Sequence, residues 1–295
     1  MQINKIINLF ILERAAILRI ETVRYIKDQI NALNKYFIQN NIYDFNDLKK
    51  SNILDFIQLE KNKKNSNVTI NKKISMLKRL IKFSVLYDQE LTKDLNMILN
   101  LPKLREHSIS YLTLSNDELK KVIYFYSNLN ITEFREFRLK IILGVLLSTG
   151  CRATELLNIK IKNINLNTRK IYLEYTKTEK PRYVYFPVSF AENLENYIIR
   201  YNNDFLITNY KGEYLGINAL VCIFKRLSEK LGFKVSPHII RHTFATKQLE
   251  NGIDLESLRK LMGHTRLTTT QIYLLLNDNF VQSQYDKYNI FVHED

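Results

Sequence analysis

The first hundred residues contain no glycine and no proline, the two residues that most often end or bend regular secondary structure. The 295-residue chain holds only seven glycines and four prolines, and the first of either is Pro102. Nothing in this stretch opposes helix, and apolar residues recur in it at helical spacing. The sequence predicts helices near residues 5–20, 22–40, 46–59, 69–88 and 90–99. We therefore expect residues 1–104 to form an all-helical domain.

The helix predicted over residues 69–88 has two contrasting faces. Ile70, Ile74, Leu77 and Ile81 fall on one side at i, i+4, i+7 and i+11. The opposite side gathers polar and basic residues: Asn71, Lys72, Ser75, Lys78, Arg79 and Lys82. A face that is merely solvated usually includes acids in i,i+4 pairs with its lysines, and this face has none. We predict that its four basic residues bind DNA; a solvated charged surface is the alternative.

A second domain is expected over residues 111–295. The segment 101–110 contains a proline and basic residues without periodicity, which is typical of a linker. Ser115 then opens a capping box (SNDE), the N-terminal signature of a helix. Residues 139–147 are apolar nearly all round, which predicts a central buried helix that ends at the Thr149-Gly150 turn.

Two β-rich runs, residues 171–175 and 183–186, flank the segment KTEKPR and predict a β-hairpin. Helices are expected near residues 189–200 and 216–231, with a short strand at Leu206-Ile207 between them. The predicted fold class is mainly α with a small β-hairpin or sheet.

The stretch from Ser236 onward carries the strongest local signals. Ser236 and Pro237 fit the N-cap and the first position of a helix. The helix presents a broad apolar side made of Ile240, Phe244, Ala245 and Leu249. His238 and Arg241 lie one turn apart and project towards that same side. A guanidinium there is costly unless an anion meets it, so we expect a site.

Two further short helices are expected after this one. Gly252 ends the first helix, and an amphipathic helix around Leu258 ends at Gly263-His264. Thr268 can cap a third helix, which carries Tyr273. The three short helices and their ends therefore carry two histidines, one arginine and one tyrosine.

These motifs resemble the second conserved box of the tyrosine recombinases, the phage-integrase and Xer group. The resemblance rests on HIIRH, on LMGH and on Tyr273, which follows His264 by nine residues. The earlier family motif, TG-x-R-x-x-E-L, is matched by residues 149–156. Arg152 and Glu155 occupy its two charged positions.

The family also places a lysine in a β-hairpin between the two boxes, and Lys177 in TKTEKPRYVYFP fits. Lys180 is the alternative, because many relatives have a glycine-containing turn where this chain has Glu179 and Pro181. The expected residues occur in order across residues 111–295. The resemblance implies an N-terminal helical core-binding domain and a C-terminal tyrosine-recombinase catalytic domain.

A defined reaction is implied by the resemblance: a tyrosine hydroxyl attacks a DNA phosphodiester and leaves a 3′-phosphotyrosyl link and a free 5′-hydroxyl. The implied catalytic residues are Arg152, Lys177, His238, Arg241, His264 and Tyr273. Glu155 is expected to orient an arginine or a histidine. His242 is expected to be structural, because helix geometry turns it away from Arg241.

These residue types suit that chemistry. Arg152 and Arg241 stay protonated and present planar forks to the oxygens of a doubly negative transition state. His238 and His264 add hydrogen-bond donors, and His238 can also take the proton of the phenol. Lys177 is the candidate acid that protonates the leaving 5′-oxygen.

The chain carries a formal net charge of +14, and basic residues exceed acids both in residues 1–110 and in the remainder. Double-stranded DNA is therefore the expected partner. Two cysteines make no disulfide framework, which suggests a reduced, cytoplasmic setting. Glu13 and Arg14 interrupt the N-terminal apolar run, and no stretch approaches the ~18 apolar residues of a membrane helix.

No metal and no other cofactor are expected. HIIRH lacks the glutamate of the H-E-x-x-H zinc motif, and no Walker motif for ATP occurs. The phosphotyrosyl bond stores the energy for rejoining.

A mobile-element or phage integrase and a Xer-type chromosome-dimer resolvase both fit, and no separate arm-binding domain is expected. A non-catalytic DNA-binding regulator would have lost one or more catalytic residues, and a topoisomerase is disfavoured by the close spacing of the second box.

The resemblance also implies a tetramer on two paired sites and a Holliday-junction intermediate. Residues 279–291 carry more apolar side chains than a solvated terminus should show. We expect this tail to dock in a neighbouring protomer, and packing on its own domain is the alternative.

Overall fold

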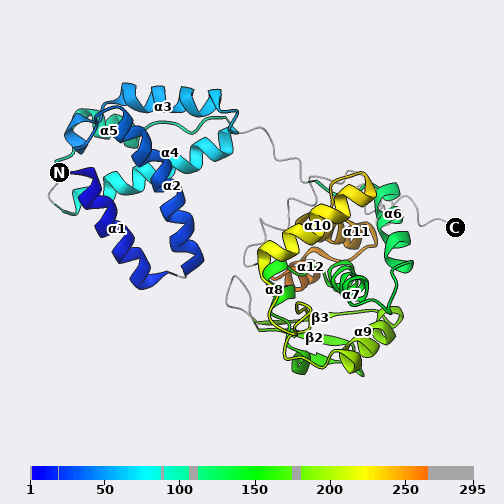
Figure 1. The fold of residues 1–295 in the computed structure, drawn as a ribbon. Coiled ribbons are helices and arrows are strands. Elements are labelled where there is room, and N and C mark those ends of the chain that lie inside the picture. Colours follow the sequence, from blue (N-terminus) through cyan, green and yellow to red (C-terminus); the bar gives the residue numbers. More distant parts are fainter. Residues whose placement is uncertain (1, 19, 88–89, 106–111, 175–180, 265–295) are drawn as a thin grey trace. The chain divides into compact units, whose positions relative to one another are not determined.

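The computed structural model describes residues 2–18, 20–87, 90–105, 112–174 and 181–264 (Figure 1). The chain divides into two compact units, residues 1–109 and residues 110–295. Each unit has its own hydrophobic core. We call them the N-terminal unit and the C-terminal unit.

The described part of the N-terminal unit is all helical. Its elements are α1 (Ile3–Ile17), α2 (Ile20–Gln39), a 3-10 helix (Phe45–Asp47), α3 (Lys50–Asn62), α4 (Asn67–Val85) and α5 (Lys93–Leu99). α4 packs against α1, α2, α3 and α5 and so forms the centre of the unit. The five helices predicted from the sequence are confirmed.

One helix start differs from the prediction. α3 begins at Lys50 rather than near residue 46, because the Asp44 side chain accepts a hydrogen bond from the Asn46 backbone N–H (2.9 Å). The chain after Asp44 therefore makes a separate 3-10 turn, which buries Phe45 completely. In α4 the predicted apolar side is buried, with Ile70 and Leu77 fully inaccessible.

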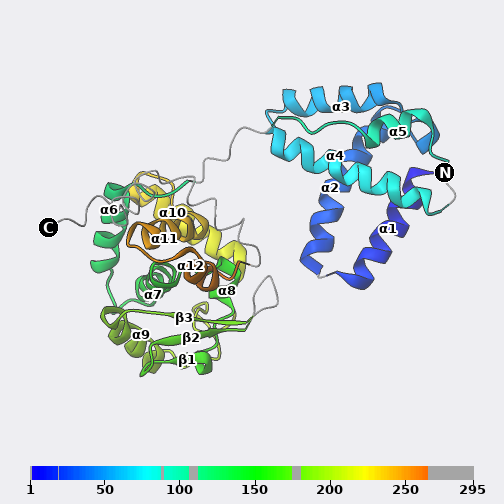
Figure 2. The same ribbon diagram turned by 180° about the vertical axis from the view of Figure 1, so that it is seen from behind.

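The described part of the C-terminal unit combines helices with a small sheet (Figures 1 and 2). Its elements are α6 (Asn116–Ser127), α7 (Phe134–Thr149), α8 (Ala153–Leu157), a 3-10 helix (Ile161–Asn163), β1 (Ile164–Asn165), β2 (Lys170–Leu173), β3 (Arg182–Tyr185), α9 (Val188–Arg200), α10 (Ile217–Leu231), α11 (Pro237–Glu250) and α12 (Leu255–Met262). α7 packs against α6, α8, α9, α11 and β3, and every residue from Lys140 to Leu146 is buried. The predicted central helix is confirmed.

The sheet is antiparallel, in the order β1-β2-β3, with Ile171 opposite Val184. The two strands of the predicted hairpin form, whereas the two-residue β1 was not predicted. The predicted strand at Leu206-Ile207 is wrong. Both residues are buried, but only the flanking Phe205 and Thr208 make isolated bridges, so the backbone there is tied down without joining the sheet.

Local capping fixes the helices that surround the site. Ser115 and Glu118 form the predicted capping box at the start of α6. Ser236 caps α11, where its Oγ accepts the Ile239 backbone N–H (3.2 Å), and Pro237 occupies the first turn. The apolar side of α11 packs against α12 and buries Phe244 and Leu249. No helix in the described ranges is long and apolar enough to cross a membrane.

Candidate active site

Arg152 and Glu155 meet at the start of α8. Gly150 ends α7 in the left-handed region (φ +59°), and the following turn brings Arg152 to the N-cap of α8. The Arg152 backbone N–H donates to Glu155 Oε2 (2.8 Å), and its Nη1 donates to Oε1 (2.9 Å). The Glu155 carboxylate is buried. The two charged positions of the TG-x-R-x-x-E-L motif are therefore in direct contact.

Arg182, the first residue of β3, holds the same carboxylate. Its Nη1 donates to Glu155 Oε1 and its Nη2 to Oε2, each at 2.9 Å. Burial raises the pKa of Glu155, but the hydrogen bonds and charge of Arg182, followed by those of Arg152, lower it to about 2. The sequence interpretation missed Arg182. Strand alternation was the available signal, because Arg182 shares the inward face of β3 with the buried Val184.

Arg241 lies buried on α11 and joins three segments. Its Nη1 donates to the Gly150 carbonyl (2.7 Å), its Nη2 donates to the Met262 carbonyl (2.7 Å), and Nη2 lies 3.0 Å from His264 Nε2. A guanidinium only donates, so His264 accepts at Nε2 and its ring is neutral. Burial lowers the pKa of His264 to about 3, and neighbouring arginine charges, Arg241 first, add to the effect.

His238 contacts another histidine. Its Nε2 lies 2.8 Å from the Nε2 of His242, one turn further along α11, so one ring donates and the other accepts. Burial lowers the pKa of both rings, and for His242, which lies nearly out of solvent, the charges of His238 and Arg241 help to lower it to about 4. His242 is thus the described partner of His238, a contact that the i,i+4 spacing could have indicated.

At the C-terminal end of α12, four consecutive backbone carbonyls each accept a hydrogen bond from a different arginine side chain. We call residues 261–264 the α12 turn. The donors are Arg182 Nε to Leu261 (2.8 Å), Arg241 Nη2 to Met262 (2.7 Å), Arg152 Nη2 to Gly263 (3.4 Å) and Arg259 Nη1 to His264 (2.9 Å). Carbonyls at a helix C-terminus carry partial negative charge, which attracts cations. The turn therefore gathers arginines from α8, β3, α11 and α12 around His264.

Part of the predicted DNA-contact face of α4 makes hydrogen bonds to the segment that follows α5. Lys72, Arg79 and Lys82 are exposed, whereas Lys78 is half-buried and its Nζ donates to the Leu101 carbonyl (2.6 Å). Burial lowers the pKa of Lys78, and the nearby charge of Lys82 lowers it further. The Asn71 side chain exchanges two 2.9 Å hydrogen bonds with the backbone of Leu104. α4 therefore holds the chain that leaves the N-terminal unit.

Several predicted residues lie outside the described ranges. Lys177, Lys180 and Tyr273 are among them, as are the third short helix of the second box and the tail, residues 279–295. The strands β2 and β3 that flank Lys177 are described, and they form the predicted hairpin pair. Arg152, Arg241 and His264 come together, while His238 sits one turn before Arg241 on α11.

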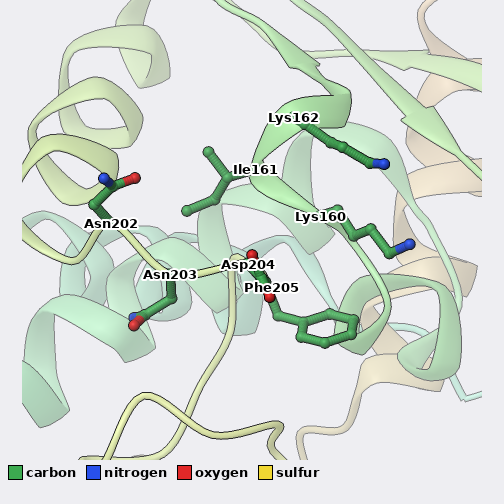
Figure 3. A pocket seen from close by; sticks show the side chains of 7 residues that line it. All are labelled: Lys160, Ile161, Lys162, Asn202, Asn203, Asp204 and Phe205. Atoms are coloured by element: carbon green, nitrogen blue, oxygen red, sulfur yellow. The ribbon is translucent and has the colours of Figure 1, made fainter.

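An open hollow of about 560 Å³ lies elsewhere on the C-terminal unit (Figure 3). Lys160 and Lys162 extend on one side of it, with Phe205 below Lys160 and Asn202 on the opposite side. None of the described predicted catalytic residues lines it. Among the residues that the structure describes, no cluster of three or more histidine, cysteine, aspartate or glutamate side chains could hold a metal ion.

Comparison with known proteins identifies the family. The model of the phage integrase family matches residues 113–279. Tyrosine recombinase XerA of Pyrococcus furiosus is 30% identical over 228 residues, covering 75% of this chain and 74% of that protein. A probable integrase/recombinase of Acholeplasma phage L2 is 30% identical over 229 residues, covering 76% of each. A lambda integrase dimer bound to a COC′ core site shares the fold, with a TM-score of 0.76 at 14% identity over 92% of this chain and 77% of that one. The chain therefore belongs to the phage integrase family, and the relatives named here include a tyrosine recombinase.

Proposed function

We propose that this chain is a site-specific recombinase that cuts and rejoins double-stranded DNA through a 3′-phosphotyrosyl intermediate. The observation that carries the proposal is the meeting of Arg152, Arg241 and His264 at the α12 turn, nine residues before Tyr273. Such a cluster of fixed cations can meet a phosphate whose charge grows during reaction. A non-catalytic regulator would have no need to keep it assembled.

The reaction forms one bond and breaks one bond at phosphorus. The phenol oxygen of Tyr273 attacks the scissile phosphate, the bond from phosphorus to the 5′-oxygen breaks, and the energy stays in the phosphotyrosyl ester. Arg152 and Arg241 stabilise the non-bridging oxygens, and they keep their charge throughout. The reverse attack by a 5′-hydroxyl from a partner duplex rejoins the strand and releases the tyrosine.

Two proton transfers accompany this exchange. A free tyrosine with a pKa near ~10 is a weak nucleophile, so a base must take its proton. His238 suits that role, because burial lowers its pKa and the neutral ring can accept a proton. Lys177 protonates the leaving 5′-oxygen, with Lys180 as the alternative. Neutral His264 contributes a hydrogen bond rather than a charge.

DNA binding is proposed for both units. Residues 1–104 would bind the core site through the exposed Lys72, Arg79 and Lys82 of α4 and the half-buried Lys78 between them, and residues 111–295 would carry catalysis. The chain's net charge of +14 supports this partner. Four copies would act on two sites through a Holliday junction, in the cytoplasm, either as an integrase of a mobile element or as a Xer-type resolvase. The DNA that flanks the gene would distinguish these two subclasses.

Strand exchange tests the proposal. A duplex selected by the full chain from a random-sequence pool is end-labelled and mixed with an unlabelled duplex, in buffer containing EDTA and no nucleotide. We expect recombinant strands and a protein–DNA adduct that survives SDS. Arg152→Ala and Arg241→Ala should each lower the cleavage rate by ~10²–10³. Strands cut without an adduct would indicate a hydrolytic nuclease, and bound but uncut DNA would indicate a regulator.

A further inference from the structure

Arg182 occupies an inward position that the proposed chemistry does not use. Its side chain is 10% exposed and donates through all three of its nitrogens: two to the Glu155 carboxylate and one to the Leu261 carbonyl. The protein itself thus holds this guanidinium at Nε, Nη1 and Nη2. Arg182 is therefore placed to orient its neighbours within the protein.

The geometry around Glu155 shows what Arg182 contributes. Glu155 Oε1 accepts from both Arg152 Nη1 and Arg182 Nη1, each at 2.9 Å, so the carboxylate orients two guanidinium groups at once. The bidentate pair with Arg182 is the stronger arrangement, because two parallel hydrogen bonds fix both planes. Glu155 held in this way presents one oxygen to Arg152 in a fixed direction.

Arg182 also fixes the α12 turn. Its Nε bonds to the Leu261 carbonyl, and a Cβ added at Gly263 would lie 2.7 Å from its Nη1. Gly263 further needs the left-handed region, with φ at +62°. The guanidinium thus packs directly against the backbone that precedes His264. One side chain on β3 touches both the partner of Arg152 and the turn that carries His264.

The balance of charges in this cluster supports the same role for Arg182. Arg152, Arg182 and Arg241 bring three positive charges, and Glu155 brings one negative charge. Arg152 and Arg182 share the carboxylate, so the cluster keeps an excess of positive charge for a phosphate. Without Arg182, the Glu155 carboxylate would instead neutralise Arg152, and the field at the phosphate would weaken.

We propose that Arg182 is a positioning residue, which through Glu155 and the Leu261 carbonyl sets Arg152 and the α12 turn for phosphate binding. This inference rests on the proposed recombinase function. It predicts a defect in the stabilisation of phosphate charge in the folded chain, separate from any loss of stability, and no defect in DNA binding. A substrate that lacks that charge should therefore lose less in an Arg182 variant than a normal substrate does.

The test compares two nicked duplexes of the selected site, one with the normal scissile phosphate and one with an uncharged methylphosphonate there. Covalent adduct formation is timed on both with the full chain, Arg182→Met, Arg182→Lys and Arg152→Ala. Arg200→Met is the control, because Arg200 also donates to two carbonyls, those of Ile131 and Thr132, and lies outside the site. The ratio of the two rates in one sample does not depend on how much of the variant is folded.

We expect Arg182→Met to slow adduct formation on the phosphate duplex by roughly 10- to 100-fold, by analogy with the loss when a residue that orients a metal ligand is removed. Its loss on the methylphosphonate should be smaller, as for Arg152→Ala. Arg182→Lys should recover part of the rate, and Kd for the duplex should not change. A wild-type rate ratio in Arg182→Met, whether its rates fall or not, would overturn the inference. A wild-type chain that forms no adduct would overturn the proposed function itself, and this inference with it.

Discussion

Single residues at this site combine burial with charge. Glu155 is 1% exposed and remains a carboxylate because two arginines meet it. Removing one partner of a buried ion pair typically costs about 3–5 kcal/mol, because a charge is left uncompensated. His264 shows the opposite case: it lies among arginines, and the neutral ring is the form that this environment favours.

The buried histidines predict how stability depends on pH. The pKa values of His264 and His242 fall from 6.5 to about 3 and about 4 in the folded chain. Below pH 6.5 the unfolded chain therefore binds protons that the folded chain does not, so the free energy of unfolding of the DNA-free protein falls as the pH drops from about 7 towards 4. His264→Gln should flatten this fall. Urea unfolding at several pH values measures it.

The titration of Glu155 does not contribute to the slope of stability against pH between about pH 7 and 5. Its pKa is lowered from 4.5 to about 2, so the stability that it contributes is complete above pH 4.5 and is lost only below it. If His264→Gln kept the same slope between about pH 7 and 5, the pH dependence would come from other groups.

The sequence named several residues that the structure brings together, but it did not predict all of their partners. Arg152, Glu155, Arg241 and His264 were named from short motifs, and the structure brings them together. Arg182 was missed, because its contact with Glu155 joins residues 27 positions apart through a tertiary contact. Helix and strand periodicities describe faces, and they do not say which faces meet.

At the scale of elements, the site depends on the close approach of α7 and α11. Gly150 ends α7 with φ at +59°, and its carbonyl accepts a hydrogen bond from Arg241 on α11. A Cβ at Gly150 would lie 2.3 Å from Cδ1 of Phe244, also on α11. Glycine is thus needed there for its backbone conformation and for space.

Gly150→Ala should therefore be strongly destabilising. The left-handed conformation costs a non-glycine residue roughly 1–2 kcal/mol, and an overpacked contact adds about 1–3 kcal/mol. Gly232→Ala is the matched control, because Gly232 also ends a helix with positive φ (+78°) but has open space around the added Cβ. Urea unfolding should show a clearly larger loss at Gly150. Equal losses would mean that Phe244 moves aside freely.

The face of α4 that we propose to bind DNA also contacts the chain that leaves the N-terminal unit. Arg79→Ala should weaken DNA binding without lowering the melting temperature, and its salt slope should fall by up to about 0.9 for each phosphate that the protein no longer neutralises. Lys78→Ala should weaken binding as well, but it should also destabilise the unit, because Lys78 holds the Leu101 carbonyl. Filter binding across salt concentrations measures both slopes. An unchanged slope in Arg79→Ala would remove this face from the DNA interface.

Prediction of elements succeeded where the pattern was long and local. The helices of the N-terminal unit followed from the missing glycine and proline and from apolar spacing. The 3-10 turn at residues 45–47 and the two-residue β1 are too short to leave a period. Leu206 and Ile207 are buried. A two-residue apolar run is compatible with burial in any backbone conformation, so it did not justify the prediction of a strand.

At the scale of the whole molecule, the two units divide the work that we propose: core-site binding in residues 1–104 and catalysis in residues 111–295. The proposed strand exchange would in addition need several copies to act together on paired sites. The tail, which lies outside the described residues, is proposed to provide that link. In sequence, the tail carries the large apolar residues Phe280, Tyr285 and Phe291, more than a solvated terminus should show.

Deleting residues 279–295 should keep the monomer folded and able to bind one site, because the proposed tail contact is made with a neighbour. Cooperative occupancy of paired sites and most strand exchange should be lost. Thermal unfolding and band shifts on one-site and two-site duplexes measure these effects. A truncated chain that unfolds, or that binds paired sites with unchanged cooperativity, would show that the tail is not a link between protomers.

The central claim is that Tyr273 forms the covalent bond to DNA. The most direct measurement is peptide mass spectrometry of the adduct formed on the nicked duplex, for the full chain, Tyr273→Phe and Tyr210→Phe, where Tyr210 is an exposed control tyrosine. We predict that the nucleotide mass lies on the peptide containing Tyr273 in the full chain and in Tyr210→Phe. Tyr273→Phe should bind the duplex and form no adduct. An adduct that persists in Tyr273→Phe, or one attached to another residue, would contradict the claim.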